Sequence, residues 1–155
     1  MAGRIDAKLK ELGISLPIPA APIANYVPYL VAGNVVSVSG QGPAEGGTFT
    51  ILGRVGEEVT LEEGYRAARL CFISVLGHLK VACGGDLDRV RQVVRLGGFV
   101  ATAPDFKQHA AVMNGASDLA VAVFGDAGRH TRTTVGAATL PMGIAVEVEG
   151  MFWIA

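Results

Sequence analysis

The chain has 155 residues, of which 50% are hydrophobic and only 17% are charged, and its formal net charge is −1. Soluble domains usually carry about 25% charged residues, so this chain is poor in charge. The length fits one domain over residues 1–155. The sequence has no basic cluster, which argues against a nucleic acid partner, because phosphate binding needs a stripe of Lys and Arg. We expect part of the abundant apolar surface to lie between subunits.

Nothing in the sequence resembles a targeting or membrane segment. The first residues lack the apolar run of a signal peptide. The most apolar window, residues 27–39, is too short for a membrane helix and contains Pro28 and Asn34. Cys71 and Cys83 fall in one predicted helix about 18 Å apart, which is beyond disulfide reach. We therefore expect reduced, buried cysteines, no membrane partner and a cytoplasmic location.

The first 14 residues are expected to form a helical extension of the domain. Ile5, Leu9 and Leu12 share one stripe of a predicted helix, which Gly13 can end. Three prolines between residues 15 and 24 then predict an extended connector.

Two β-rich runs, residues 26–31 and 35–39, flank Gly33-Asn34 and predict a hairpin. Residues 40–47 contain four glycines and are expected to form a loop. Residues 48–52 are expected to form a short strand.

A long helix is predicted from Thr60 to about Cys83. Thr60 and Glu63 match the capping box, in which each side chain satisfies a backbone N–H group of the other residue. Apolar residues keep helical spacing along this segment, and Gly84-Gly85 can end it.

The C-terminal half is predicted to contain three strands and one helix. Val90–Thr102 is rich in Val and indicates a strand, and Pro104-Asp105 can open a helix that ends near Phe124. The last two strands are expected at Arg132–Leu140 and Gly143–Ile154. Two long helices on one face of a mixed sheet then make a two-layer α+β fold.

Arg132 and Glu147 are the main candidates for a functional site, and we expect them on adjacent strands. Arg132 and Thr134 share one strand face, and Glu147 shares another with Glu149. An arginine offers a planar fork of donors that suits a carboxylate, and a glutamate can position a water. The alternatives are a surface salt bridge at Arg132, and a solvent-facing Glu147 or one paired with Arg132.

Two further patterns contain residue types that can bind ligands. Ser39-Gly40-Gln41-Gly42 follows a predicted strand and can either bind an anion or form a plain turn. His78, His109 and His130 have no second ligand at helical spacing, so no metal site is predicted. His130 stands two residues before Arg132 and either lines the same site or is an exposed loop residue.

Between Ala24 and Ile154 the chain resembles the Rid/YjgF family, which is also called endoribonuclease L-PSP. The resemblance is carried by Tyr26-Val27, Gly33-Asn34, Ser39-Gly40-Gln41, Gly84-Gly85-Asp86-Leu87, Asn114, Arg132, Leu140-Pro141 and Val146-Glu147-Val148-Glu149. Ala24-Asn25, Gly136 and Thr139 depart from the family pattern, which indicates a divergent branch.

The resemblance implies a chorismate-mutase-like fold assembled as a homotrimer, with a site between subunits. Members of the deaminase type hydrolyse enamines and imines of 2-oxo acids, such as 2-aminoacrylate, without a cofactor. By this resemblance Arg132 binds the substrate carboxylate and Glu147 holds the attacking water. Tyr26, Ser39, Gly40 and Asn114 line the cleft, and Thr134 stands where many relatives have a cysteine.

Three functions are therefore considered. The first is a cofactor-free hydrolase of such imines, and the second is a regulatory trimer that binds a small carboxylate without turnover. The third is the ribonuclease of the older family label, against which the lack of a basic groove and of a histidine pair argues.

Overall fold

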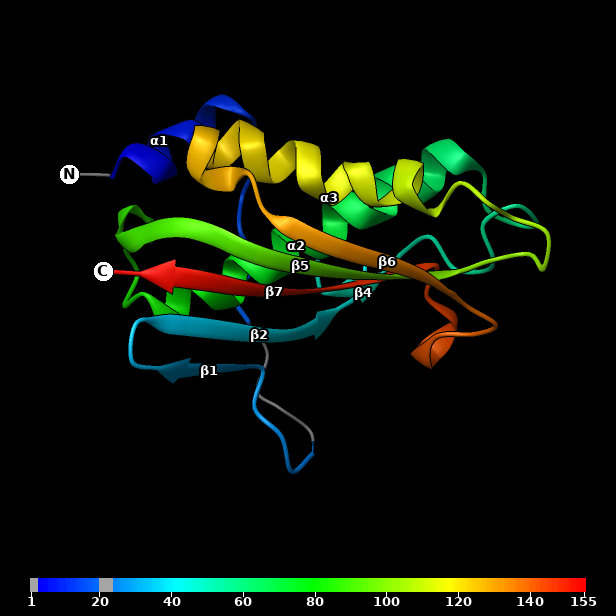
Figure 1. Ribbon diagram of the computed structural model, residues 1–155, viewed down its shortest axis with the longest axis horizontal. Coiled ribbons are helices and arrows are strands. Elements are labelled where there is room, and N and C mark those ends of the chain that lie inside the picture. Colours follow the sequence, from blue (N-terminus) through cyan, green and yellow to red (C-terminus); the bar gives the residue numbers. More distant parts are fainter. Residues whose placement is uncertain (1–2, 20–23) are drawn as a thin grey trace.

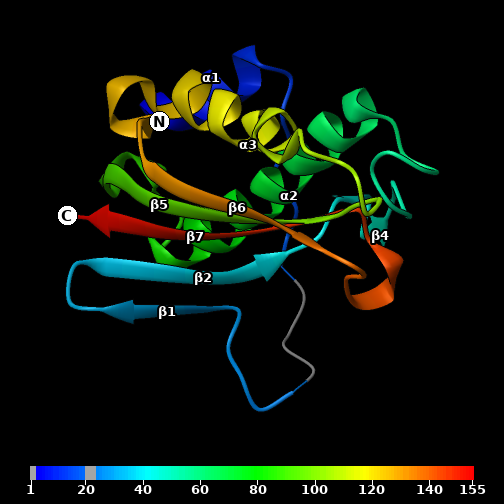
Figure 2. The same cartoon turned by 45° about the vertical axis from the view of Figure 1, so that its right-hand side comes forward.

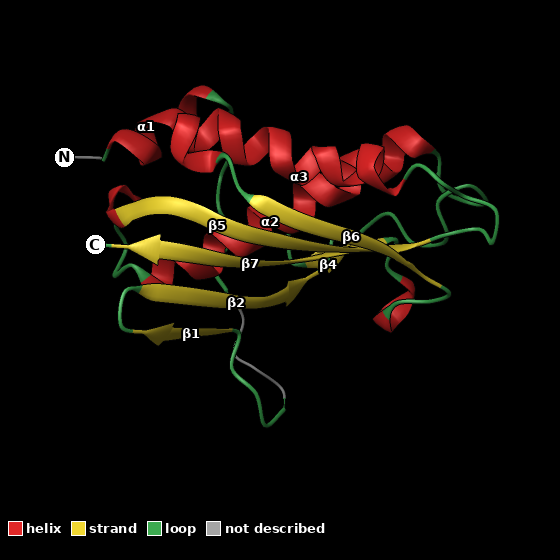
Figure 3. Ribbon diagram, viewed as in Figure 1, coloured by secondary structure: helices red, strands yellow, loops and turns green. Residues whose placement is uncertain are grey.

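The computed structural model describes residues 3–19 and 24–155. Five strands form one sheet in the order β1-β2-β7-β5-β6, and helices α2 and α3 cover one of its faces (Figures 1 and 2). The strands of this sheet are β1 (Tyr29–Ala32), β2 (Val35–Gln41), β5 (Val90–Ala101), β6 (Thr131–Ala137) and β7 (Val146–Ile154), and the helices are α1 (Arg4–Glu11), α2 (Leu61–Ala82) and α3 (His109–Phe124). The sheet is mixed because β6 runs parallel to β5, whereas the other pairs are antiparallel. The expected α+β two-layer fold is confirmed (Figure 3).

The core lies between the sheet and the two long helices. Side chains alternate along β7, so Val146, Val148 and Phe152 point toward the helices and are fully buried. Glu147 and Glu149 point to the opposite side of the sheet. We call the sheet surface that faces away from α2 and α3 the open face.

The expected adjacency of the two C-terminal strands is wrong, because β5 lies between β6 and β7. The 12-residue β5 pairs with β6 along one edge and with β7 along the other. The connection between β6 and β7 therefore crosses the end of β5, and it contains the short helix η3 (Pro141–Gly143). The local sequence pattern predicts which residues form strands, but it does not predict which strands are neighbours in the sheet.

Two boundaries also differ from expectation. Helix α3 begins at His109 rather than after Pro104. The intervening chain is used elsewhere, since Ala103 donates a backbone hydrogen bond to the Val55 carbonyl, and the Val55 amide donates to Ala101. Residues 101–103 are thus held extended against Val55, and a turn at Pro104-Asp105 separates them from α3.

Helix α1 is part of the packed structure. Ile5 and Leu9 are 1% and 4% exposed and belong to the hydrophobic core. The amides of Arg4 and Ile5 donate to the two carboxylate oxygens of Asp88, both at 2.8 Å. These bonds hold the pKa of Asp88 below its usual value. Among the described residues no helix is both long and apolar enough to cross a membrane.

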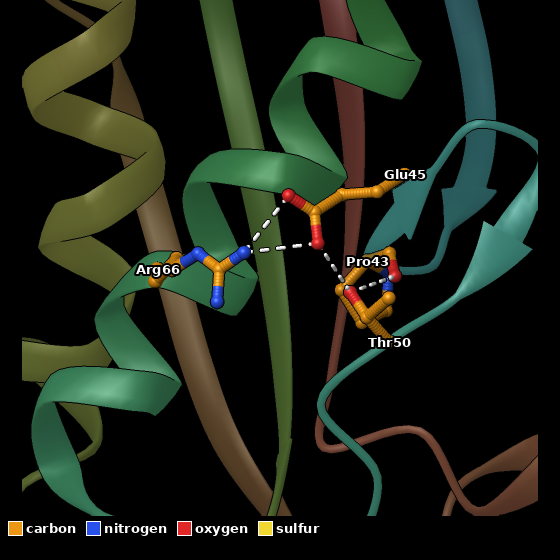
Figure 4. A network of polar contacts seen from close by, with 4 residues as sticks. All are labelled: Pro43, Glu45, Thr50 and Arg66. Carbon is orange, nitrogen blue, oxygen red and sulfur yellow. Dashed lines mark hydrogen bonds and ion pairs between the residues drawn. The ribbon is translucent and has the colours of Figure 1, made fainter.

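The segment after β2 forms a small hairpin rather than the expected loop and single strand. Its strands are β3 (Ala44–Glu45) and β4 (Thr48–Phe49). Figure 4 shows how it is attached to α2: Arg66 Nη2 donates to both carboxylate oxygens of Glu45, at 2.8 and 2.9 Å. Thr50 Oγ1 donates to the same carboxylate at 3.2 Å. Exposed contacts of this kind stabilise little, but they fix the position of the hairpin.

Candidate functional site

Arg132 lies on β6, the edge strand, and its side chain points toward α3. Its register partner Leu96 is fully buried under the helices, so Arg132 is on the helix side of the sheet. Nη1 donates to Ser117 Oγ at 3.0 Å, and Nη2 donates to the Ala110 carbonyl at 3.1 Å. Among the described residues these are the only side-chain hydrogen bonds of Arg132, so three of the five N–H groups of the guanidinium have no protein partner there.

A pocket of about 340 Å³ opens beside this guanidinium. We call it the arginine pocket, and it is lined by Asn114, Ser117, Asp118, Val121, Arg129, His130 and Arg132. Asn114 and Ser117 are one turn apart on α3 and therefore share a helix face. The lining contains two arginines and one carboxylate, that of Asp118, so its net positive charge favours an anionic ligand. Arg129 is paired with Asp126 at 3.5 Å, which leaves Arg132 as the main anchor.

His130 lines this pocket and is not an exposed loop residue. The ring is half-buried, with Nε2 2.8 Å from Ser117 Oγ and Nδ1 2.6 Å from the Gly128 carbonyl. The expectation of an exposed residue fails because residue 130 meets α3, which a local pattern does not reveal.

Glu147 lies on the open face of the sheet. Its register partner there is Phe99. The side chain is half-buried, and no hydrogen bond to it is found among the described residues. Burial raises the pKa of Glu147, and repulsion from Glu149 raises it further. A carboxylate with a raised pKa and no protein partner is suited to exchange a proton with a water or a ligand.

Gly40 supports the position of Glu147. A Cβ atom on Gly40 would overlap Glu147 Oε1 and lie 2.8 Å from its Cδ. Ser39, Gly40 and Gln41 belong to β2, so the expectation of a turn there is wrong. The pairing of β2 with β7 is irregular between Val38 and Gln41, which brings Gly40 against the glutamate.

Ser39 connects this region to Tyr26. Its hydroxyl donates to the Val27 carbonyl and its amide to the Pro28 carbonyl, both at 2.8 Å. The segment that contains Tyr26 is thereby attached to the end of β2, and the Tyr26 side chain is 61% exposed. Gly40 thus contacts Glu147, and Ser39 joins the segment that contains Tyr26 to the same end of β2.

The candidate residues therefore form two groups on opposite sides of the sheet. Asn114 and Arg132 are together in the arginine pocket, whereas Glu147 and its neighbours are on the open face. An ion pair between Arg132 and Glu147 within one chain is excluded, because the sheet separates them. Thr134 faces the helix side like Arg132, but its Oγ1 is covered and has no partner in the described part of the chain.

Two contacts near the candidate residues were not predicted. Ser117 contacts both Arg132 and His130 and had no signal except its spacing of three residues from Asn114. Gly136, a departure from the family pattern, leaves room for a neighbouring histidine: a Cβ there would lie 2.6 Å from His109 Nε2.

The structure offers no metal site among its described residues, and another hollow lacks the candidate residues. No group of three or more His, Cys, Asp or Glu residues in the described chain could hold a metal ion. This larger hollow, of about 860 Å³, lies between α1, the following connector and α2. It contains none of the candidate residues, and an ion pair between Lys80 and Asp6 at 2.8 Å lies on its lining.

The sheet order, the two covering helices and the divided site define a small α+β protein of chorismate-mutase-like architecture. A family model described as "YjgF/chorismate_mutase-like, putative endoribonuclease" matches residues 6–149. The chain therefore belongs to the YjgF/Rid family.

Individual relatives agree with this assignment. Protein TCP17 of Trypanosoma cruzi is 48% identical over 151 residues, covering 97% of this chain and 94% of that protein. The structure of Atu1372 of Agrobacterium tumefaciens, a protein of unknown function, gives a TM-score of 0.92 at 44% identity, covering 97% of this chain and 92% of that one. A "putative endoribonuclease" of Shewanella oneidensis gives 0.94 at 34% identity, covering 98% and 100%.

Proposed function

We propose that this protein hydrolyses reactive imines and enamines of 2-oxo acids, of the 2-aminoacrylate type, without a cofactor. The observation that carries the proposal is the division of the site. A fixed arginine and a glutamate with a raised pKa lie on opposite sides of one sheet. Such a pair can act together only if two subunits of a homotrimer meet, the arginine pocket of one against the open face of the next.

The chemistry requires an anchor for a carboxylate and a group that handles protons. Arg132 holds the substrate carboxylate through its free N–H groups. Once the enamine has tautomerised to the imine, a water adds to the C=N carbon and gives a proton to Glu147. Glu147 passes that proton to the nitrogen, which gives a carbinolamine. Glu147 then takes the proton of the new hydroxyl as the C=O bond forms and passes it to the nitrogen, so that the C–N bond breaks, ammonia leaves and a 2-oxo acid remains. The raised pKa of Glu147 suits it to these proton transfers.

The open face supports contact between subunits. It carries the exposed apolar side chains of Val35, Met151 and Trp153, which are 37%, 39% and 49% exposed. Apolar patches on a sheet surface are typical of protein interfaces. Glu147 lies on the same face, so a neighbour that covers it would also enclose the glutamate.

A complementation experiment tests the divided site. The protein is mixed with 2-aminoacrylate generated in situ, and pyruvate formation is followed. Arg132→Ala and Glu147→Ala should each abolish acceleration. A mixture of equal amounts of the two variants, unfolded and refolded together, should recover about a quarter of wild-type activity, because one site in four then combines an intact arginine with an intact glutamate.

Two results would contradict the proposal. No acceleration over buffer by well-folded wild-type protein removes the hydrolase function. Activity in wild type without recovery in the refolded mixture removes the shared site, since Arg132 and Glu147 would then not combine across two subunits. A third variant, Arg129→Ala, serves as the matched control for loss of a positive charge at the same pocket.

A regulatory trimer that binds a carboxylate without turnover is the second candidate. It is favoured by the arginine pocket, which is complete within one chain. Stabilisation by pyruvate that is lost in Arg132→Ala, in the absence of any hydrolysis, would support it. The ribonuclease activity in the family description is third. It requires cleavage that persists through purification and disappears in Glu147→Ala.

A further inference from the structure

A chain of hydrogen bonds runs from the carboxylate anchor to Ser117 and His130, to which the proposed hydrolysis gives no role. It leads from Arg132 Nη1 to Ser117 Oγ at 3.0 Å, and from Ser117 Oγ to His130 Nε2 at 2.8 Å. It ends where His130 Nδ1 lies 2.6 Å from the Gly128 carbonyl oxygen. Three different elements, β6, α3 and η2 (Gly125–Gly128), are joined by it.

The direction of each bond follows from the chemistry of its ends. A carbonyl oxygen only accepts, so Nδ1 of His130 must carry a proton to bond Gly128. In the neutral ring Nε2 is then the acceptor, and the hydroxyl of Ser117 must donate to it. The guanidinium at the other end only donates, so Ser117 Oγ accepts from Arg132.

Ser117 is left with a defined polarity. Its single hydrogen is committed to His130, and one of its two lone pairs is committed to Arg132. The remaining lone pair can accept a hydrogen bond but cannot donate one. Ser117 Oγ therefore acts as a fixed acceptor at the wall of the arginine pocket.

We infer that Ser117, oriented by His130, selects ligands that carry an N–H or O–H group next to the carboxylate bound by Arg132. The inference rests on the proposed function, because it requires a carboxylate on Arg132. Ser117 Oγ is 3.0 Å from Arg132 Nη1, whose second hydrogen has no protein partner among the described residues. With a carboxylate on that hydrogen, a group attached to the carbon beside the carboxylate would be within reach of Ser117. A 2-imino, 2-amino or 2-hydroxy acid can donate to this oxygen, whereas a 2-oxo acid presents only an acceptor.

The same polarity distinguishes substrate from product. The imine nitrogen carries a hydrogen and donates it to Ser117 Oγ. In the product a keto oxygen replaces this nitrogen, and the keto oxygen and Ser117 Oγ are then both acceptors. The product is thus held less tightly than the substrate. One neutral hydrogen bond of this kind corresponds to a preference of about fivefold.

Lactate and pyruvate are matched probes, since they differ only in the 2-hydroxyl and the 2-keto group. Calorimetric titration of the wild-type protein should give a Kd for the better-bound lactate enantiomer about fivefold below that for pyruvate. In Ser117→Ala the ratio should fall to about one. Ser117→Thr, which keeps a hydroxyl, should retain the preference.

His130→Ala separates positioning from simple contact. It leaves Ser117 in place but frees its hydrogen, so the hydroxyl can donate to the keto group, and the preference should fall toward one through tighter pyruvate binding. A merely structural role for His130 would weaken both ligands equally and leave the ratio unchanged. The ratio is an internal control, because any shift of Arg132 in these variants affects both carboxylates alike.

The outcomes separate this inference from the proposed function. If wild type binds pyruvate as tightly as lactate, or if Ser117→Ala keeps the wild-type ratio, the role of Ser117 is overturned while carboxylate binding stands. If wild type binds neither acid, both the inference and the carboxylate anchor fail.

Discussion

Replacement of Gly40 by alanine tests the position of Glu147 without altering the glutamate itself. The added Cβ would overlap Glu147 Oε1 and lie 2.8 Å from Cδ and 3.0 Å from Cγ. Carbon atoms in contact are about 3.5–4.0 Å apart, so the carboxylate must move by about 1 Å. A displacement of that size at a catalytic group costs about 100-fold in rate.

The cost in stability should be much smaller than the cost in rate. Glu147 is half-buried, and the overlapping atoms are the far end of its flexible side chain. Moving such a side chain away from its preferred rotamer costs about 0.5–1.5 kcal/mol. Gly40→Ala should therefore fold normally, unfold at slightly lower urea concentration and hydrolyse 2-aminoacrylate about 100-fold more slowly.

Gly97→Ala is the matched control on the same sheet face. Its Cβ would lie 2.7 Å from Glu149 Oε1 and would displace Glu149 instead of Glu147. This variant should keep its kcat/KM for imine hydrolysis within about threefold of wild type, in line with the small effects of most surface changes. Equal losses in the two variants, or full activity in Gly40→Ala, would refute the assignment of Glu147 to the reaction.

Three further predictions concern charge and packing. Glu149→Gln should shift the acid limb of the pH–rate profile to lower pH, because repulsion from Glu149 raises the pKa of Glu147; an unshifted limb would contradict this. Asp88→Asn should lower the free energy of unfolding at neutral pH by about 1 kcal/mol in urea titrations. The pKa of Asp88 is lowered in the folded state, so its stabilisation of the fold is fully present above its unfolded pKa. This stabilisation disappears as pH falls through the lowered pKa. A stability difference from wild type that persists in acid would argue against the bonds from Asp88 to the start of α1. Gly115→Ala should destabilise by about 1–3 kcal/mol, because its Cβ overlaps the Tyr65 carbonyl oxygen, whereas an unobstructed helix position would gain about 1 kcal/mol.

Local signals in the sequence placed the main elements well. The capping box at Thr60 is present as predicted, with Glu63 bonded to the Thr60 amide at 2.8 Å and the Thr60 hydroxyl bonded to the Glu63 amide at 3.1 Å. Strand alternation also assigned Arg132 and Thr134 to one face, because a period of two depends only on neighbouring residues.

The order of the strands in the sheet could not be predicted from the local sequence pattern. Consecutive strands pair in about two thirds of cases, which made adjacency of β6 and β7 the natural expectation. The fold instead inserts β5, whose partners are decided by long-range packing. The same limit affected His130, whose surroundings are determined by Ser117 on α3. Whether Arg132 and Glu147 face the same way depends on the whole sheet and not on their spacing.

The contact between α1 and Asp88 has a consequence for the order in which the chain folds. A helix of eight residues is marginal by itself in water, and this one depends on a carboxylate 84 residues away for its first turn. During synthesis α1 is made before Asp88, so its first turn lacks this carboxylate until the chain has been extended by 84 residues from Arg4. The helix is thus made well before the group that stabilises it.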